Sequence, residues 1–249
     1  MEVGFKTDKG IKRSNNEDAC YVMPRRRVFI VADGVGGSNS GEIASRTAVN
    51  EIVRYVDEHP LSRANTTHKI KKYFGDCISE VNDTVLENAQ RFVENRGMAT
   101  TAVVAYIYKG KMYVMNVGDS RAYVYRRGRL TQITEDHTYV NSLVKAGVIT
   151  KEEAEFHENR NMITRAVGAD YTVEPDFFVT RLHQDDIVLM CTDGLYGEVS
   201  REELMREFSQ GKTMGDTCAD LIDLANHHGG NDNITIICLR ITEDDIDEQ

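Results

Sequence analysis

The sequence predicts an α+β fold in which helices cover antiparallel β-sheets on both sides. Short segments rich in apolar and β-branched residues dominate the middle of the chain, and tight turns separate several of them. Longer amphipathic patterns lie before and after these segments. Strands that tight turns join must run antiparallel, because parallel neighbours need a long crossover connection. This excludes a doubly wound dinucleotide-binding fold for the middle of the chain.

The expected strands are apolar runs bounded by turn residues. Lys109-Gly110, between two of them, is typical of a two-residue hairpin turn. The last two strands carry apolar residues on both faces, which indicates burial on both sides. The strands are expected at residues 28–32, 101–108, 111–117, 121–126, 130–133, 187–191 and 234–241.

The expected helices follow from apolar residues at helical spacing. This spacing predicts two long helices, over residues 43–56 and 70–92, and a later helix around 221–225 that ends near Gly229. Residues 141–156 favour two short helices, which would form an appendage to the core.

The amino-acid composition excludes several classes of protein. The 249 residues include 40 acidic and 30 basic side chains, a net charge of −10, which argues against a general nucleic-acid or anionic-membrane binder. No apolar run approaches the roughly 18 residues of a membrane span, and the first residues lack a signal-peptide core, so we expect a cytoplasmic protein. The five scattered cysteines form no CxxC pair, which excludes a zinc ribbon.

The chain shows no boundary between domains. It has three prolines, no repeat and no low-complexity segment, so we expect one domain over residues 1–242. The acidic tail at 243–249, which includes Asp247 and Glu248, is expected to be a solvated, frayed end.

Aspartates follow the expected strands repeatedly. Asp33 and Asp193 each precede a glycine at a strand end, Asp119 follows a third strand, and Asp232 precedes the last one. A single Asp-Gly after a strand is usually only a turn. Several carboxylates that meet at one sheet edge repel one another and need a counter-ion. Oxygen ligands of this kind suit Mg²⁺ or Mn²⁺ and do not suit zinc.

Three competing phosphate or hydrolase motifs fail. Residues 36–41 have the outer spacing of a P-loop, but Glu42 stands where that motif needs lysine. Cys20 and Arg26 have the spacing of a cysteine phosphatase, but the residues between them lack the glycines that direct backbone N–H groups at phosphate. No Gly-x-Ser-x-Gly elbow is present. Arg13 is either a surface ion-pair partner or a fork that holds phosphate oxygens.

Taken together, the motifs resemble the metal-dependent protein phosphatase family, type 2C. Residues 134–138 and 163–168 are also similar to the bacterial branch, and the resemblance covers residues 7–241. The motifs that carry it are Arg13-x3-Glu17-Asp18, Asp33-Gly34-x-Gly36-Gly37, Gly118-Asp119-Ser120-Arg121, Thr192-Asp193-Gly194-Leu195 and Gly230-Asn231-Asp232-Asn233.

The resemblance implies a four-layer α-β-β-α sandwich: two antiparallel β-sheets flanked by helix pairs, with a small helical flap at about residues 135–169. It also implies two Mn²⁺ or Mg²⁺ ions and a third, weaker one. Asp33 would bridge the two ions, with the Gly34 carbonyl on the second. Asp193 and Asp232 would complete the first site, and Asp119 would help hold the third ion.

The remaining roles implied by the resemblance concern substrate and water. Glu17 and Asp18 would act through metal-bound water, and Arg13 would bind the substrate phosphate. The implied activity is hydrolysis of phosphoserine and phosphothreonine in proteins by a hydroxide that two metals activate, without a phosphoenzyme. The implied partners are phosphorylated proteins, including a cognate Ser/Thr kinase whose signalling the enzyme would reverse, and we expect a monomer.

One departure leaves the general acid open. Many eukaryotic members have histidine after the Asp-Gly pair, where this chain has Val35. Ser38 and Asn39 cannot titrate in its place, and a helix-end role is favoured for His227 and His228. Two alternatives to a protein phosphatase also stay open: a catalytically silent module that binds phosphoproteins, and a phosphatase for a small metabolite or for regulators of sigma factors.

Overall fold

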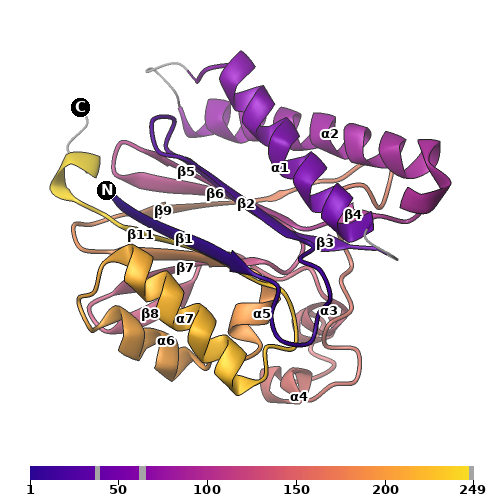
Figure 1. Ribbon diagram of the computed structural model, residues 1–249. Coiled ribbons are helices and arrows are strands. Elements are labelled where there is room, and N and C mark those ends of the chain that lie inside the picture. Colours follow the sequence, from indigo (N-terminus) through magenta and orange to yellow (C-terminus); the bar gives the residue numbers. More distant parts are fainter. Residues whose placement is uncertain (37–39, 62–65, 247–249) are drawn as a thin grey trace.

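The computed structural model describes residues 1–36, 40–61 and 66–246. Two antiparallel sheets lie face to face between two pairs of helices, so that the chain forms four layers (Figure 1). The predicted α+β class with two antiparallel sheets is therefore confirmed. None of the helices in the described ranges is both long and apolar enough to cross a membrane.

The two sheets differ in strand order. The first has the order β1-β11-β10-β7-β8, and the second has the order β2-β3-β5-β6-β9, with β4 paired to β3. The first sheet comprises β1 (Glu2–Asp8), β11 (Ile234–Arg240), β10 (Ile187–Cys191), β7 (Arg121–Arg126) and β8 (Arg129–Gln132). The second comprises β2 (Asp18–Met23), β3 (Val28–Val35), β4 (Ala99–Thr100), β5 (Ala102–Tyr108), β6 (Lys111–Val117) and β9 (Asp176–Arg181).

The helices cover the outer faces of both sheets (Figure 1). Those over the second sheet are α1 (Ser40–Glu58) and α2 (Thr67–Arg91), and those over the first are α6 (Arg201–Phe208) and α7 (Met214–His228). The shorter elements are α3 (Tyr139–Lys145), α4 (Lys151–Glu155), α5 (Asp193–Tyr196) and the 3₁₀ turns η1 (Val93–Asn95) and η2 (Glu243–Asp245). The two long early helices, the late helix and the appendage of two short helices match the sequence predictions.

Burial on both faces explains the apolar run of β3. Ile30 and Ala32 pack toward α1 and α2, whereas Phe29 and Val31 pack against the other sheet. A strand that is buried on both sides loses the alternation of apolar and polar residues. The sequence did not predict β1, β2 and β9, which are partly exposed strands at sheet edges, or β4, which has only two residues.

The connection from β6 to β7 differs from the expected hairpin pairing. These consecutive strands do not pair with each other, because the chain crosses from the second sheet to the first at Gly118 and Asp119. Gly118 has a φ of 102°, and a Cβ there would lie 2.5 Å from Thr101 Cγ2. Only glycine fits this corner. The corner places Asp119 between the two sheets.

Part of the acidic tail is ordered, which corrects the expectation of a frayed end for residues 243–246. Asp245 is 3% exposed, and its carboxylate lies 2.8 Å from the Met1 amine and 3.5 Å from Arg27 Nη2. These two cations offset the cost of burying the carboxylate. Asp247 and Glu248 lie outside the described residues.

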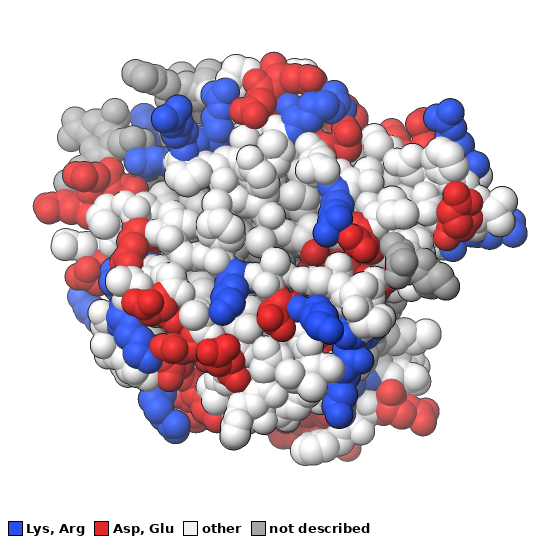
Figure 2. Space-filling model, viewed as in Figure 1, with Lys and Arg blue, Asp and Glu red and all other residues white. Residues whose placement is uncertain are grey.

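Charges are mixed on the surface. On the face that Figure 2 shows, acidic and basic side chains are interspersed around an uncharged area over the central strands. The basic side chains on that face form no continuous patch.

Candidate active site

A pocket of about 500 Å³ opens where strand ends of both sheets meet. The predicted site residues that line it are Arg13, Glu17, Asp33, Gly34, Asp119, Asp193 and Asp232. Asp18 is the one predicted site residue outside the lining, and it stands directly opposite Asp33 in the β2–β3 register. The prediction that carboxylates at strand ends converge is therefore confirmed. The aspartates that meet in the pocket lie far apart in the sequence, between positions 33 and 232.

Strands β2 and β3 fix Asp18 and Asp33. The Asp33 backbone N–H donates to Thr101 Oγ1 at 2.8 Å, and its carbonyl accepts from Thr100 Oγ1 at 2.8 Å. Asp18 is 5% exposed, and its Oδ2 accepts from Thr192 Oγ1 at 2.8 Å. Thr192 precedes Asp193, so one hydroxyl ties the two sheets together beside the pocket.

Close backbone approach explains two glycines of the site. A Cβ on Gly34 would lie 2.0 Å from the Gly41 carbonyl oxygen, and one on Gly194 would lie 2.0 Å from the Asn233 carbonyl oxygen. Side chains at these positions would push the β3–α1 segment and the Asp232 loop away from the pocket. Gly37, the last residue of the Asp-Gly-x-Gly-Gly motif, lies outside the described residues, as do Ser38 and Asn39.

Asn233 positions the loop that carries Arg13 and Glu17. Its Nδ2 donates to the carbonyls of Lys9 at 2.9 Å and Asn15 at 2.8 Å, and its Oδ1 accepts from the Glu17 N–H at 2.8 Å. An amide side chain can make all three bonds because it carries both donors and an acceptor. In the sequence, Asn233 is part of the Gly230-Asn231-Asp232-Asn233 motif, but no role was predicted for it. Its place beside Asp232 was the available signal.

Arg13 forms an ion pair at the mouth of the pocket. Its Nη2 lies 2.7 Å from Asp232 Oδ2, and about half of the arginine side chain is exposed. The sequence left open whether Arg13 is a surface ion-pair partner or lies in the site, and the structure places it in both settings. Asp232 is therefore paired with Arg13 in this structure.

Asp33, Asp18 and Asp193 have raised pKa values. Burial, followed by the charges of Asp18 and Asp193, holds the pKa of Asp33 well above its usual range. Burial is also the main cause that raises the pKa of Asp18 to about 7 and that of Asp193 to about 6. The Oδ1 atoms of both residues are buried and have no hydrogen-bond partner among the described residues. These carboxyls repel one another, and the charge of Arg13 offsets this only in part for Asp193.

The donor set suits a hard cation, although the ligands are not yet gathered around one point. Within the described ranges, no group of three or more His, Cys, Asp or Glu side chains is already arranged to hold a metal ion. The lining nevertheless supplies carboxylate oxygens and the Gly34 backbone, and oxygen donors of this kind are those that Mg²⁺ and Mn²⁺ prefer. The unpartnered Oδ1 atoms of Asp18 and Asp193 fit such an ion.

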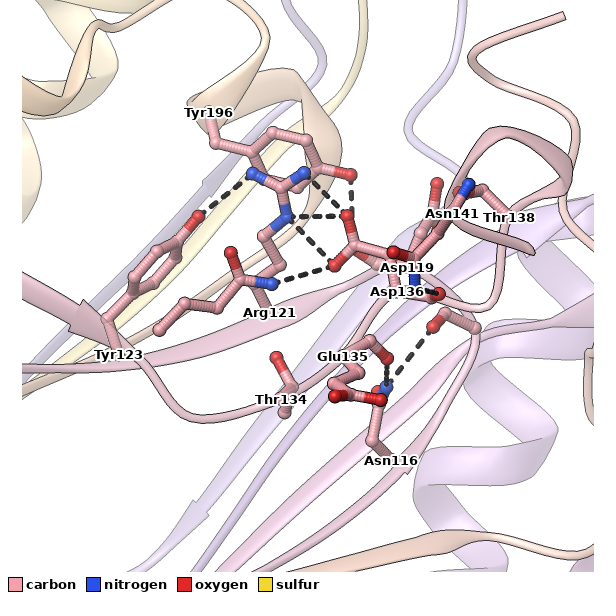
Figure 3. Close-up of polar contacts among 12 residues, drawn as sticks. Asn116, Asp119, Arg121, Tyr123, Thr134, Glu135, Asp136, Thr138, Asn141 and Tyr196 are labelled. Carbon is pink, nitrogen blue, oxygen red and sulfur yellow. Dashed lines mark hydrogen bonds and ion pairs between the residues drawn. The ribbon is translucent and has the colours of Figure 1, made fainter. Parts of the chain in front are cut away.

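A cluster of polar side chains, formed by Tyr196, Arg121 and Asp136, lies next to Asp119 (Figure 3). The Tyr196 hydroxyl donates to the Asp119 carbonyl at 3.0 Å, and Arg121 lies over the Tyr196 ring. Arg121 also donates to both carboxylate oxygens of Asp136. Burial raises the pKa of Asp119 to about 7, and the charges of Asp193 and Asp136 add to the effect.

The flap begins at this cluster and ends in the pocket wall. Asn141 of α3 donates to the Asp136 carbonyl at 2.7 Å. On the return path, Arg165 lines the pocket, and its Nη1 donates to Asp176 Oδ1 at 2.9 Å. The sequence singled out residues 163–168 without a role, and residues 163–166 of this segment line the pocket.

Comparisons with known proteins agree with this geometry. The family model described as protein phosphatase 2C matches residues 10–224. The serine/threonine phosphatase stp of Listeria monocytogenes is 35% identical over 240 residues, which cover 95% of this chain and 94% of that protein. The crystal structure of serine/threonine phosphatase Stp1 from Staphylococcus aureus has a TM-score of 0.89 and 35% identity, and the match covers 97% of this chain and 95% of that chain.

A further solved structure carries metal. The catalytic domain of the serine/threonine protein phosphatase PstP, in complex with two manganese ions, has a TM-score of 0.83 and 31% identity. The match covers 97% of this chain and 98% of that chain. This chain belongs to the protein phosphatase 2C family.

Proposed function

We propose that this chain is a metal-dependent serine/threonine protein phosphatase that hydrolyses phosphoserine and phosphothreonine in proteins. The observation that carries the proposal is the convergence of buried carboxylates and one arginine on a single pocket. Membership of the protein phosphatase 2C family and the names of the bacterial relatives support it. The enzyme would reverse bacterial Ser/Thr kinase signalling, with a cognate kinase among its partners. A monomeric state and a cytoplasmic location stay predictions from the sequence.

The proposed metal ligands are the pocket carboxylates. Asp33 would bridge two ions, Asp193 and Asp232 would complete the first site, and the Gly34 carbonyl would bind the second ion. Asp119 would help hold a third, weaker ion, and Glu17 and Asp18 would act through water. Two bound Mn²⁺ or Mg²⁺ ions would neutralise the carboxylates and lower the pKa of water at the site.

Arg13 is the proposed phosphate-binding residue. One of its nitrogens bonds Asp232, and the half-exposed guanidinium has further N–H groups at the mouth of the pocket. A planar fork of this kind binds two phosphate oxygens at once and stabilises the charge on them during hydrolysis.

The chain's thiols argue for direct attack by water and against a covalent phosphoenzyme. Cys20 does not line the pocket, and burial raises the pKa of its thiol to about 11. A thiol of this kind is almost entirely protonated at neutral pH and is a poor nucleophile. Water would therefore attack the phosphorus, and the bond from phosphorus to the serine or threonine oxygen would break.

The proton for the leaving oxygen does not have an obvious donor among the side chains. Val35 lines the pocket, but its aliphatic side chain has no ionisable group that could donate a proton to the leaving oxygen. His137 lies outside the lining, where its Nε2 is 3.2 Å from Asp176 Oδ2, and among the described residues no histidine lines the pocket. His227 and His228 end α7, as the sequence indicated. This arrangement favours water as the donor.

The direct test is hydrolysis of p-nitrophenyl phosphate and of a phosphothreonine peptide with Mn²⁺. Asp193→Asn should reduce turnover of both by at least about 100-fold, because it removes a proposed ligand. Asp223→Asn, at an exposed position on α7, is the matched control and should keep full turnover. Activity that survives EDTA or the Asp193→Asn change would overturn the proposal. Phosphopeptide binding without turnover at saturating Mn²⁺ would identify a silent binding module.

A further inference from the structure

A second hollow, of about 550 Å³, adjoins the candidate active site. The C-terminal end of α2, the η1 turn and the segment at residues 168–169 line it. Ala99 and Ala169 line both this hollow and the active-site pocket. The two hollows therefore share part of their walls, and we call the second one the α2 groove. In Figure 1, β4 lies beside one end of α1, on the side of the molecule from which the flap projects.

The walls of the α2 groove are fixed by buried contacts. Asn82 of α2 is 1% exposed, its Oδ1 accepts from the Gly168 N–H at 2.8 Å, and its Nδ2 donates to the Asp170 carbonyl at 3.0 Å. A Cβ on Gly168 would lie 2.3 Å from Val85 Cγ1, so this segment lies flat against α2. A preformed groove binds an extended segment with a smaller loss of conformational entropy than a mobile surface does.

The lining of the α2 groove is mostly apolar and includes one charged side chain. Leu86 and Val93 supply apolar surface, and Val93 is 86% exposed. Arg96 is exposed, is the one charged residue of the lining, and forms no ion pair within the described ranges. On a protein whose net charge is −10, an isolated cation beside apolar side chains favours a ligand that is both apolar and acidic.

We propose that the α2 groove binds the stretch of the substrate protein next to the phosphorylated residue, and that it selects stretches with an apolar and an acidic side chain. This inference rests on the proposed function. A phosphoprotein must continue out of the pocket once its phosphate lies at the carboxylates, and the groove adjoins the pocket at Ala99 and Ala169. The apolar side chain packs on Leu86 and Val93, and the acidic one pairs with Arg96.

The test compares phosphothreonine peptides that differ only in their flanks. One peptide carries a leucine and a glutamate near the phosphothreonine, on the N-terminal side in one version and on the C-terminal side in another. Matched peptides carry lysine for the glutamate or serine for the leucine. The measured quantity is kcat/KM for each peptide divided by kcat/KM for p-nitrophenyl phosphate, which is too small to reach the groove.

Arg96→Glu should lower this ratio about fivefold to tenfold for the glutamate peptide, because charge reversal replaces attraction with repulsion. It should raise the ratio for the lysine peptide. Val93→Ser, at a highly exposed position, should reduce the preference for leucine over serine. Arg91→Glu is the matched control, because Arg91 is also exposed at the end of α2 and does not line the groove.

Two results would overturn the inference while leaving the proposed function intact: equal ratios for all peptides in the wild type, or the same effect from Arg91→Glu as from Arg96→Glu. A peptide rate that falls as enzyme concentration rises, and recovers in Arg96→Glu, would instead identify a second copy of the chain as the occupant. Absence of p-nitrophenyl phosphate turnover with Mn²⁺ would overturn the proposed function itself.

Discussion

Arg121 donates to both carboxylate oxygens of Asp136, with its Nε 3.0 Å from each and its Nη2 2.6 Å from Oδ2 (Figure 3). The same guanidinium lies 3.5 Å from the centre of the Tyr196 ring, and Tyr196 bonds the Asp119 carbonyl. Asp136 lies at the start of the flap, and its pair with Arg121 is mostly buried. One guanidinium therefore contacts both the start of the flap and the tyrosine that bonds Asp119.

Arg121→Lys should lower kcat for p-nitrophenyl phosphate about tenfold, because lysine cannot bond both oxygens and stack on the ring together. The control is Arg126→Lys at the other end of β7, where Arg126 bonds both oxygens of the buried Asp186 at 2.7 and 2.6 Å. Both variants should lose about 1–2 kcal/mol in the free energy of unfolding, measured in urea. Equal kcat values in the two variants would show that the Arg121 pair serves stability alone.

The metal-free protein should lose stability as the pH rises. A carboxyl whose pKa is higher in the folded than in the unfolded chain favours folding when it is protonated. Stability is therefore lost as the pH rises from the unfolded pKa, and the loss is complete once the pH exceeds the folded pKa. The pKa of Asp193 is raised to about 6 and that of Asp18 to about 7, chiefly by burial. In EDTA, the free energy of unfolding should fall by on the order of 2 kcal/mol between pH 5 and pH 8. A flat profile over this interval would contradict the assignment.

Arg13→Ala should separate phosphate binding from metal binding. Its kcat/KM for p-nitrophenyl phosphate should fall about 100-fold, because charge-assisted bonds to the phosphate are lost. Removal of the 2.7 Å pair with Asp232 should leave Mn²⁺ binding at least as tight as in the wild type, measured by calorimetry. Weaker Mn²⁺ binding in this variant would mean that Arg13 organises the carboxylates instead.

Asp119→Ala should lower turnover while the tighter pair of ions stays bound. Asp119 sits on the corner between the sheets, apart from the facing pair of Asp18 and Asp33. Calorimetry with Mn²⁺ should therefore lose one weak binding event and keep the stronger ones. Loss of all Mn²⁺ binding would contradict a role confined to a third ion.

The sequence predicted the convergence of Asp33, Asp119 and Asp193 because each follows a strand, and strand ends meet at sheet edges. It could not predict the pairing of Arg121 with Asp136, because that contact depends on how the chain crosses from one sheet to the other after β6. The three bonds of Asn233 join residues more than 200 positions apart, and no local pattern encodes them.

The strands β1, β2 and β9 were missed for a different reason. They lie at sheet edges with many side chains partly exposed, and pairing with a neighbouring strand defines them more than propensity does. The ordered η2 turn was missed because its buried Asp245 is stabilised by cations that lie near the start of the sequence.

The pairing of β1 with β11 sets the order in which the protein can become active during synthesis. Thr7 and Thr235 face each other across these strands although 228 positions separate them. A chain still emerging from the ribosome holds β1 without its partner, and the loop after β1 without Asn233. Arg13 and Glu17 therefore reach the pocket only when the last strand has been made. An unfinished chain leaves every phosphoprotein it meets untouched.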